Sequence, residues 1–360
     1  MRVLQLIDSL ETGGAERVAV NIANALVAEI ETSFLCTTRK EGLLKESLSD
    51  DVGYVFLNKI KTIDFGAIKR LNRLIRAEKI NIIHAHSSSF FLATIMKLLN
   101  NNVSVVWHDH YGNSDYLNER KFGVLKFCSK YFNHIFSVNR LLEAWAVQKL
   151  KFNNVSYLPN FASVDKKPEK TILNGISGKR IVCLANLRPQ KDHFTLLEAF
   201  KQIVKIHPEW TLHCIGKDFN DEYSRAIASK IKKSGLTQSC FLYGSKPDIF
   251  NILNQCEIGV LSSKSEGLPV ALLEYGLSGL AVVATKVGEC GVVITNNQNG
   301  LLVKPSDANS LFEAISLYIE NETLRNNHST SYKKNILENY SEKTQLQTIL
   351  NIYSKHINLQ

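Results

Sequence analysis

The sequence predicts an α/β protein of two domains, each with a parallel sheet that carries helices on both faces. Three observations support this prediction. The chain has 360 residues, more than one hydrophobic core usually organises. Short apolar runs alternate with longer segments of helical spacing, as in successive βαβ units. The alternation stops once, near residue 155, and begins again near residue 180.

The first half opens with an apolar strand, a glycine turn and an amphipathic helix. Its strands are apolar throughout, which is typical of strands buried on both faces of a parallel sheet. Between them, apolar residues recur at helical spacing. The expected strands are 2–7, 32–38, 81–86 and 104–110, and the expected helices are 17–30, 64–80 and 89–100.

The segment 155–180 holds two prolines, several lysines and little periodicity, so we interpret it as an interdomain linker. The same strand and helix rhythm then returns. The expected strands are 180–187, 211–216, 240–244, 258–263 and 281–285, and the expected helices are 192–207, 222–235, 246–256 and 269–279. The two Rossmann-like domains are therefore expected at 1–162 and 178–339. A helix at about 340–360 is expected to pack back on the first domain.

The composition fits a soluble globular protein, with 44% hydrophobic and 21% charged residues. The net charge of +9 suits nucleic acid, an anionic membrane surface or phosphorylated substrates. Lysines and arginines are dispersed and no nucleic-acid motif occurs, so we expect no nucleic-acid partner. Seven scattered cysteines without a Cys-x-x-Cys pair, and the lack of a secretory signal, favour reduced thiols and a cytoplasmic location.

Candidate phosphate-binding residues follow the first strand of each half. Ligands of open α/β sheets bind beyond the carboxyl ends of the strands. Gly13 and Gly14 precede a helix whose N-terminus favours a phosphate, although a tight turn would also require glycine. The dinucleotide fingerprint Gly-x-Gly-x-x-Gly is absent. In the second half, Arg188 and Lys191 suit a diphosphate, with solvated loop positions as the alternative.

Two glutamates bracket the start of a helix in "SKSEGLPVALLEYG" (263–276). Pro269 is expected as the first helical residue, where its missing N–H has no cost. Glu266 and Glu274 would be ordinary solvated positions unless they line the cleft, where carboxylates bind sugar hydroxyls well. With cations from Arg188 and Lys191 nearby, the ligand that fits is a nucleotide sugar.

Four histidines end two neighbouring strands. His84 and His86 end one, and His108 and His110 flank Asp109 at the end of the next. Alternate strand residues share a face, so each pair points to one side, either into a site or into the core. A metal centre is conceivable from these residue types, but the absence of Asp-x-Asp argues against a metal-dependent donor site. For His84 we favour a core position.

The expected helix 64–80 carries a basic stripe. Its cations are Lys69, Arg70, Arg73 and Arg76, and its apolar face is Phe65, Ile68, Leu71 and Ile75. Such a stripe is usually a solvated face, yet a basic amphipathic helix also docks on anionic lipid. The inner face of the membrane is thus a candidate partner surface.

The sequence resembles a glycosyltransferase of family 4, a retaining enzyme with two facing Rossmann-like domains (the GT-B fold). The matching stretches are "GGAER", "LRPQKD", "NGLLV" and "EGLPVALLEYG", which fits the family's Glu-x7-Glu motif. The resemblance covers nearly the whole chain. The sequence departs from the family where Gly-Gly-x-x-Glu is common, since it has "VGECGVV" there (287–293), which puts a donor contact from that loop in doubt.

The resemblance implies roles for the candidate residues. Glu274 would hold the ribose and Glu266 the donor sugar, and Arg188 with Lys191 would grip the diphosphate. The backbone of Gly267, Leu268 and Pro269 would face sugar and phosphate. A histidine of the acceptor domain would lie near the reacting carbon, with His110 the first choice and His108 the second.

The function expected from these residues is transfer of a sugar from a nucleotide-diphosphate sugar, with no cofactor and no metal. The acceptor would be a glycan or lipid-linked glycan in surface or lipid-linked polysaccharide biosynthesis. In the retaining mechanism usually proposed for this family, the leaving phosphate helps to deprotonate the acceptor hydroxyl. The alternatives are a sugar-nucleotide epimerase or hydrolase, or a non-catalytic protein of this fold that binds sugar nucleotides.

Overall fold

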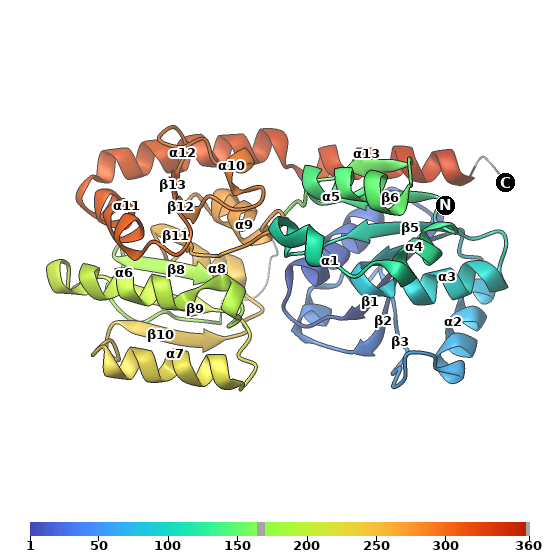
Figure 1. Ribbon diagram of the computed structural model, residues 1–360, viewed down its shortest axis with the longest axis horizontal. Helices are drawn as coiled ribbons and strands as arrows, with labels where there is room; N and C mark the ends of the chain where they lie inside the picture. The colour runs from blue at the N-terminus through green and yellow to red at the C-terminus, as the bar shows by residue number, and fades with distance from the viewer. Residues whose placement is uncertain (164–169, 358–360) are drawn as a thin grey trace. The chain divides into compact units, whose positions relative to one another are not determined.

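The chain forms two compact α/β units (Figure 1). The computed structural model describes residues 1–163 and 170–357. Unit 1 comprises Met1–Phe161 and Glu342–Gln360, and unit 2 comprises Ala162–Ser341. Of the expected linker and tail, residues 164–169 and 358–360 lie outside the described part of the chain.

Unit 1 is built on a seven-stranded sheet in which all neighbouring strands are parallel. The order is β3-β2-β1-β4-β5-β6-β7. The strands are β1 (Arg2–Ser9), β2 (Thr32–Lys40), β3 (Gly53–Phe56), β4 (Ile82–His86), β5 (Ser104–Asp109), β6 (His134–Ser137) and β7 (Val155–Tyr157). The order reverses direction between β1 and β4, which is where open α/β sheets bind ligands.

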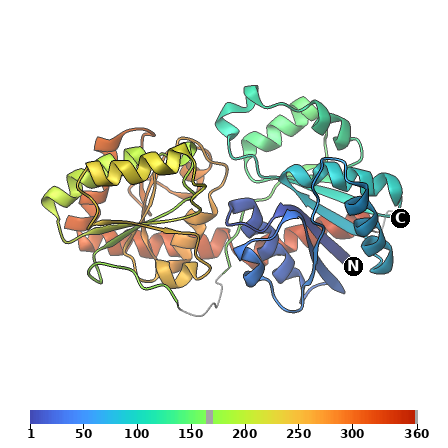
Figure 2. The same ribbon diagram turned by 90° about the horizontal axis from the view of Figure 1, so that it is seen from below.

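Two groups of helices cover this sheet. A core on one face is formed with α2 (Phe65–Ala77), α3 (Phe90–Leu99), α4 (Gly123–Ser129) and α5 (Arg140–Trp145). A smaller core on the other face is formed with α1 (Gly14–Leu26). The C-terminal helix α13 (Glu342–Ile357) contacts α1 and runs along the same side of the sheet (Figure 2). Segments from both ends of the chain therefore build one unit.

Unit 2 repeats the arrangement with a six-stranded parallel sheet of order β10-β9-β8-β11-β12-β13. The strands are β8 (Arg180–Leu184), β9 (Thr211–Ile215), β10 (Cys240–Gly244), β11 (Ile258–Leu261), β12 (Ala281–Thr285) and β13 (Leu301–Val303). The helices are α6 (His193–Ile206), α7 (Glu222–Lys233), α8 (Ile249–Leu253), α9 (Val270–Ser278), α10 (Cys290–Val293), α11 (Ala308–Glu320) and α12 (Glu322–Asn339).

The segment expected as a linker is partly structured. Its first residues form β7, so the linker prediction is wrong at 155–157. Farther on, the carboxylate of Asp248 accepts hydrogen bonds from the backbone of Lys170 and Thr171, at 2.9 and 2.7 Å. Several hydrogen bonds to Asp248 lower its pKa to about 2, against the opposing effect of burial. Both ends of this segment are therefore held by distant parts of the chain: β7 pairs with β6, and residues 170 and 171 bond to Asp248.

Two further details differ from expectation. Pro269 has an extended ψ of 119° and precedes α9, so the helix starts at Val270, one residue later than predicted. Phe65, expected on the buried face of α2, is 81% exposed. It lies in the first turn of α2, whereas Leu71 and Ile75, farther along the helix, are buried.

The seven cysteines are free thiols, and all but Cys256 are buried. Within residues 1–163 and 170–357, no helix has the length and apolarity needed to cross a membrane.

Candidate active site

The candidate donor site of unit 2 lies where the strand order reverses, between β8 and β11. The loops after these two strands carry most of the residues that the sequence singled out. Lys264 N donates to Gln190 O at 2.8 Å, and Ser262 Oγ donates to Lys191 O at 2.9 Å. The two loops are thus bonded to each other at the carboxyl edge of the sheet, as the strand-end argument predicted.

Lys191 and Glu266 meet directly across these loops. The ammonium of Lys191 lies 2.6 Å from Glu266 Oε1, and Ser263 Oγ donates to the same oxygen at 2.6 Å. Glu266 is only 5% exposed. A buried ion pair of this kind holds both side chains in place, and a diphosphate that approached Lys191 would compete with Glu266 for its protons.

The loop after β12 closes against the same place. Glu289 N donates to Gly267 O at 3.0 Å. At Gly288 the φ angle is +48°, and an added Cβ would lie 2.1 Å from Glu266 O, so only glycine fits. In "VGECGVV", which departs from the family pattern, the backbone therefore still packs on the Glu266–Gly267 segment. The departure concerns the side chains that this loop presents.

Helix α9 carries Glu274, the second glutamate of the motif. Glu274 lies in the second turn and is 6% exposed, so neither glutamate is the solvated surface position that the alternative required. Gly267, Leu268 and Pro269 are buried in the turn before the helix. The N-terminus of α9 and these backbone groups give this edge of the sheet a partial positive charge.

Arg188 lies farther out in the loop after β8 and is exposed. Its guanidinium carbon lies 4.5 Å from the centre of the Phe219 ring, and Lys217 Nζ lies 4.8 Å from the same ring. Leu187 N donates to Lys217 O at 3.0 Å, which joins the loops after β8 and β9. The structure thus adds Lys217 and Phe219 beside Arg188. Sequence reasoning missed both because no motif marks them.

Gly13 and Gly14 belong to unit 1, whereas the other candidate donor residues belong to unit 2. Gly13 caps α1 with an extended backbone, and a Cβ there would lie 2.2 Å from Glu16 Oε2. The carboxylate of Glu16 therefore packs against this turn. An incoming anion would meet that carboxylate as well as the helix N-terminus.

The four histidines of β4 and β5 form one stacked cluster. Ring centres lie 4.5 Å apart for His84 and His86, 5.2 Å for His86 and His110, and 4.0 Å for His108 and His110. Parallel pairing places His86 beside His108. Two His-x-His sequences on adjacent strands therefore bring all four rings to one face of the sheet. That is the face on which α13 lies.

Hydrogen bonds join this cluster to residues that the sequence analysis did not single out. His86 contacts His110 Nε2 through Nδ1 at 3.0 Å and Gln5 Oε1 through Nε2 at 2.8 Å. Tyr353 on α13 contacts His84 Nδ1 at 2.5 Å and accepts from Gln5 Nε2 at 3.5 Å. No local signal could reveal these partners, since β1 and α13 are at opposite ends of the chain.

Burial keeps the imidazoles neutral. It lowers the pKa of His110 to about 3. It also lowers the pKa of His84, His86 and His108 well below the ordinary range, and neighbouring imidazoles add to the effect. At neutral pH these side chains are therefore uncharged.

A metal-ligand reading of the cluster meets two difficulties. One nitrogen each of His84, His86 and His108 lies within 4.8 Å of the others. Both nitrogens of His86 are already hydrogen-bonded, however. Asp109 lies on the other side of the strand, where both of its oxygens accept from Arg120 at 2.7 and 2.8 Å. No carboxylate of this motif thus joins the imidazoles to balance a cation's charge.

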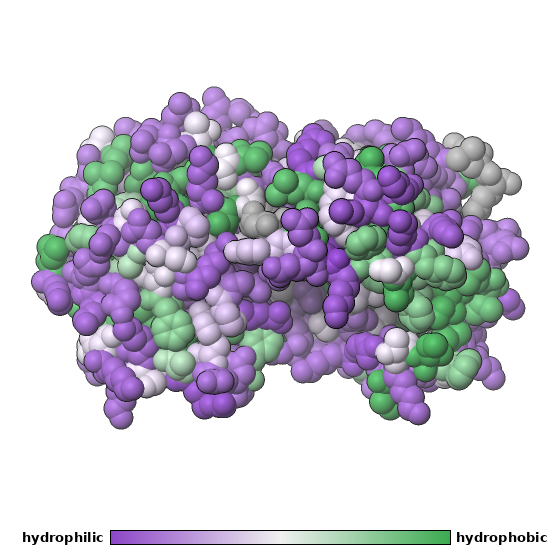
Figure 3. All heavy atoms as spheres, in the orientation of Figure 1, coloured by the Kyte–Doolittle hydropathy of each residue, from purple (hydrophilic) through white to green (hydrophobic). Residues whose placement is uncertain are grey.

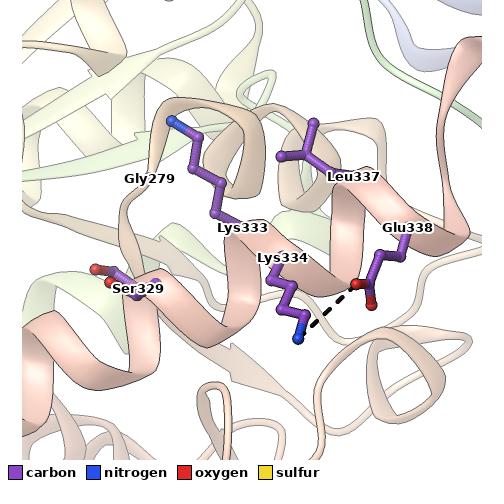
Figure 4. Close-up of a pocket in the computed structure, with 7 residues that line it drawn as sticks. Gly279, Ser329, Lys333, Lys334, Leu337 and Glu338 are labelled. Atoms are coloured by element: carbon purple, nitrogen blue, oxygen red, sulfur yellow. Dashed lines mark ion pairs between the residues drawn. The ribbon is translucent and has the colours of Figure 1, made fainter.

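A shallow pocket of about 450 Å³ lies elsewhere in unit 2, between α12 and the end of α9 (Figure 4). The residues that line it are Gly279, Ser329, Thr330, Lys333, Lys334, Leu337 and Glu338. None of the candidate site residues belongs to it. Figure 4 shows Lys334 directed toward Glu338, its ion-pair partner at 3.9 Å.

Comparison with known proteins agrees with the division of the chain into two α/β units. Residues 12–166 match the family described as Glycosyltransferase Family 4, and residues 167–335 match Glycosyl transferases group 1. An uncharacterized glycosyltransferase of Haemophilus influenzae is 23% identical over 87% of this chain and 88% of its own length. The Escherichia coli UDP-Gal:alpha-D-GlcNAc-diphosphoundecaprenol alpha-1,3-galactosyltransferase is 24% identical over 94% and 93%.

The fold is shared with solved structures. HepE of Anabaena, crystallised with UDP and glucose, superposes with a TM-score of 0.81 and covers 99% of this chain and 100% of its own, at 18% identity. At that identity the likeness concerns the fold. Taken with the two family matches, which together run from residue 12 to residue 335, it leads to one conclusion: the chain belongs to glycosyltransferase family 4 and has the GT-B type of fold.

Proposed function

We propose that this glycosyltransferase moves a hexose-type sugar, with retention, from a nucleoside-diphosphate sugar to a hydroxyl of a glycan or lipid-linked glycan. The observation that carries the proposal is the Lys191–Glu266 pair at the carboxyl edge of unit 2. It places a cation for phosphate and a buried carboxylate for sugar hydroxyls on adjoining loops. The named activity of the Escherichia coli relative, a transfer from UDP-Gal to a diphosphoundecaprenol-linked sugar, supports the same substrate classes.

In the proposed reaction the bond between the sugar's anomeric carbon and the phosphate oxygen breaks, and a bond to the acceptor oxygen forms on the same face. The acceptor's proton passes to an oxygen of the leaving diphosphate. Arg188, Lys191 and the α9 N-terminus stabilise the charge that develops on that diphosphate. Glu266 and Glu274 bind hydroxyls of the sugar and the ribose. No protein nucleophile takes part.

We further propose that turnover requires no divalent metal. The positive charge that a metal would supply at the diphosphate comes from the guanidinium of Arg188 and the ammonium of Lys191. Turnover is expected to continue in excess EDTA. Loss of activity on chelation, with recovery when Mg²⁺ or Mn²⁺ is added, would contradict this part of the proposal.

The experiment that tests the proposal starts with a panel of nucleotide sugars screened for thermal stabilisation, because a ligand that binds the native state raises its melting temperature. Turnover of the best ligand is then measured with and without glycan acceptors. Acceptor-dependent release of nucleoside diphosphate, with the anomeric configuration retained in the product, supports the transferase. Isomerised sugar without acceptor indicates an epimerase, free sugar indicates a hydrolase, and binding without turnover indicates a sensor.

A location at the inner face of a membrane is the last part of the proposal. Exposed apolar side chains lie at the start of the basic helix α2 and in the loop before it, with Phe65 81% and Ile60 78% exposed. Apolar side chains also gather over the region of α3 and α4 in Figure 3, where Leu98, Leu99, Val124 and Phe127 are about half exposed. Helices α2, α3 and α4 are successive neighbours. An apolar surface with lysines and arginines beside it suits an anionic bilayer that carries a lipid-linked acceptor.

A further inference from the structure

We propose that Gln5 is a positioning residue that keeps the proton of His110 on Nε2 and leaves Nδ1 as a hydrogen-bond acceptor for a substrate hydroxyl. The inference rests on the proposed function insofar as His110 meets a substrate. The tautomer itself follows from unit 1 alone. The tautomer is set through a chain of hydrogen bonds around Gln5, which we call the pathway. All of its residues belong to unit 1: Gln5 on β1, His84 and His86 on β4, His110 after β5, and Tyr353 on α13.

The pathway begins at the only group in it whose donor and acceptor ends are chemically distinct. The amide nitrogen of Gln5 donates to the oxygen of Tyr353, and its carbonyl oxygen faces His86. Tyr353 has a single proton, and its oxygen already accepts from Gln5. In this arrangement Nδ1 of His84, 2.5 Å away, is the acceptor available for that proton.

Gln5 then determines the tautomer of His86. Oε1 of an amide can only accept, so His86 Nε2 must carry the proton of their 2.8 Å hydrogen bond. Because burial lowers the pKa of His86 well below its usual range, the ring is neutral and has one proton. Its Nδ1 is therefore a bare acceptor.

His86 in turn determines the tautomer of His110. The 3.0 Å contact between His86 Nδ1 and His110 Nε2 needs one proton, and His86 cannot supply it. His110 Nε2 thus donates. The pKa of His110, lowered by burial to about 3, leaves this ring neutral too, so its Nδ1 has a lone pair and no proton. Such a nitrogen accepts a hydrogen bond from a hydroxyl and cannot donate one to a phosphate oxygen.

Because the hydrogen bonds of the pathway are buried, they restrict His110 to one tautomer. Gln5 and His86 are fully buried, so water does not replace their partners. An inverted Gln5 amide would reverse every donor and acceptor and place a proton on His110 Nδ1. The structure places the amide nitrogen toward Tyr353, at 3.5 Å, and the amide oxygen toward His86, at 2.8 Å. The C-terminal helix is in this way joined to the end of β5 through three hydrogen bonds.

Nitrogen NMR of the full chain labelled with ¹⁵N-histidine tests the tautomer without any substrate. A protonated and an unprotonated imidazole nitrogen have widely separated shifts, and His110→Asn identifies the His110 signals by their loss. The expected result is a proton on Nε2 and none on Nδ1. A proton on Nδ1 in the wild-type protein would overturn the inference.

Gln5→Leu tests whether Gln5 sets this state. Without the amide oxygen, a proton on His86 Nε2 would be buried and unpaired, so it moves to Nδ1 and the His110 proton moves to its own Nδ1. Tyr353→Phe is the second variant should Gln5→Leu fail to fold. It frees the amide to invert and should give a mixture of both His110 tautomers. His108→Phe, which alters the cluster without touching a hydrogen bond of the pathway, should keep the wild-type tautomer.

An unchanged His110 tautomer in both Gln5→Leu and Tyr353→Phe would overturn the role of Gln5. Activity separates this inference from the proposed function. With the tautomer shifted, kcat should fall about tenfold, as for one lost substrate hydrogen bond. If the tautomer shifts while kcat and KM stay at wild-type values, the pathway is real and His110 has no part in the reaction. If the wild type shows no transfer at all but has the expected tautomer, the proposed function fails and the pathway remains.

Discussion

Glu266 and Glu274 illustrate how much one carboxylate depends on its immediate partners. Both are buried, and they lie eight positions apart across the start of α9. Glu266 is paired with Lys191, which means that its charge is matched before any ligand binds. If a diphosphate takes over Lys191, Glu266 needs new hydrogen-bond donors, such as sugar hydroxyls, because a buried carboxylate without a partner is costly.

The two glutamates should respond differently to loss of charge. Glu274→Gln should weaken both the nucleotide sugar and the bare nucleoside diphosphate, because the ribose is common to them. Glu266→Gln should leave affinity for the bare diphosphate unchanged or raise it, since Lys191 is no longer neutralised. It should lower turnover about 10- to 150-fold, the loss expected for a hydrogen bond to a charged group.

Calorimetric affinity, turnover and melting of both variants check this prediction. If the glutamates act only on the helix, each change shifts stability through the helix dipole by about 0.3–1 kcal/mol and leaves kinetics alone. Wild-type turnover in Glu266→Gln would remove the case for an active-site carboxylate at this position.

Arg188 and Lys191 should act together on the diphosphate. Replacing both by alanine should weaken nucleoside diphosphate binding by several kcal/mol, because charge-assisted hydrogen bonds contribute about 1.5–3 kcal/mol each. The matched control removes two other exposed cations of unit 2, Lys205 and Lys232, and should change affinity far less. Equal losses in both double variants would mean that only the overall charge of unit 2 matters.

At the scale of elements, the histidine-bearing strands β4 and β5 should make unit 1 sensitive to acid. The unfolded chain protonates these histidines near their usual pKa of about 6.5. The folded chain does not, since burial holds their pKa values well lower. Their contribution to stability is therefore complete above about pH 6.5 and is lost as the pH falls toward the folded pKa values.

Each such histidine should lower the free energy of unfolding by up to about 1.4 kcal/mol per pH unit in that range. Denaturant titrations at several pH values between 7.5 and 4.5 measure the slope in Trp210→Phe, whose remaining tryptophans, Trp107 and Trp145, lie in unit 1. His108→Phe in this background removes one titrating group and should give a shallower slope. Equal slopes in the two proteins would show that His108 is protonated to the same extent in the folded and the unfolded chain.

Helix α2 and the loop before it should govern attachment to lipid. Phe65→Ser with Ile60→Ser removes the two most exposed apolar side chains of this segment, and Lys69→Gln with Arg73→Gln removes two of its exposed cations. Each pair should weaken sedimentation with anionic vesicles, the charged pair by about 2 kcal/mol at low salt. Lys232→Gln with Lys233→Gln on α7 is the charge-matched control. Undiminished sedimentation of both α2 variants would exclude this surface as the docking face.

At the scale of the whole molecule, the fold can be predicted from those strands and helices that are long enough for a regular spacing of apolar residues to be recognised. Residues 2–7, 82–86 and 211–215 are strands as expected. The short β7 was mistaken for linker because three residues show no period and a proline follows at 159.

The candidate site residues also fall into those that the sequence can predict and those that it cannot. Strand-end logic singled out the loops of Lys191 and Glu266 because each follows a strand, and the structure brings these two loops together. That logic could not predict Gln5 and Tyr353 beside the histidines, because their contact depends on tertiary packing of α13 and spans 348 positions. Sequence patterns identify groups at element ends and do not identify the buried polar partners that set their protonation.

The last prediction concerns which unit recognises the donor. Nucleoside diphosphate at about 100 times its Kd should raise the free energy of unfolding of the unit that binds it by about 2.7 kcal/mol. Two variants separate the signals: Trp107→Phe with Trp145→Phe leaves Trp210 to report unit 2, and Trp210→Phe leaves the tryptophans of unit 1. With Lys191, Glu266 and Glu274 all in unit 2, the transition reported by Trp210 should move upward by more than the other. A shift confined to the unit 1 signal would assign the nucleotide to the histidine-bearing unit and contradict the proposed division of donor and acceptor between the two sheets.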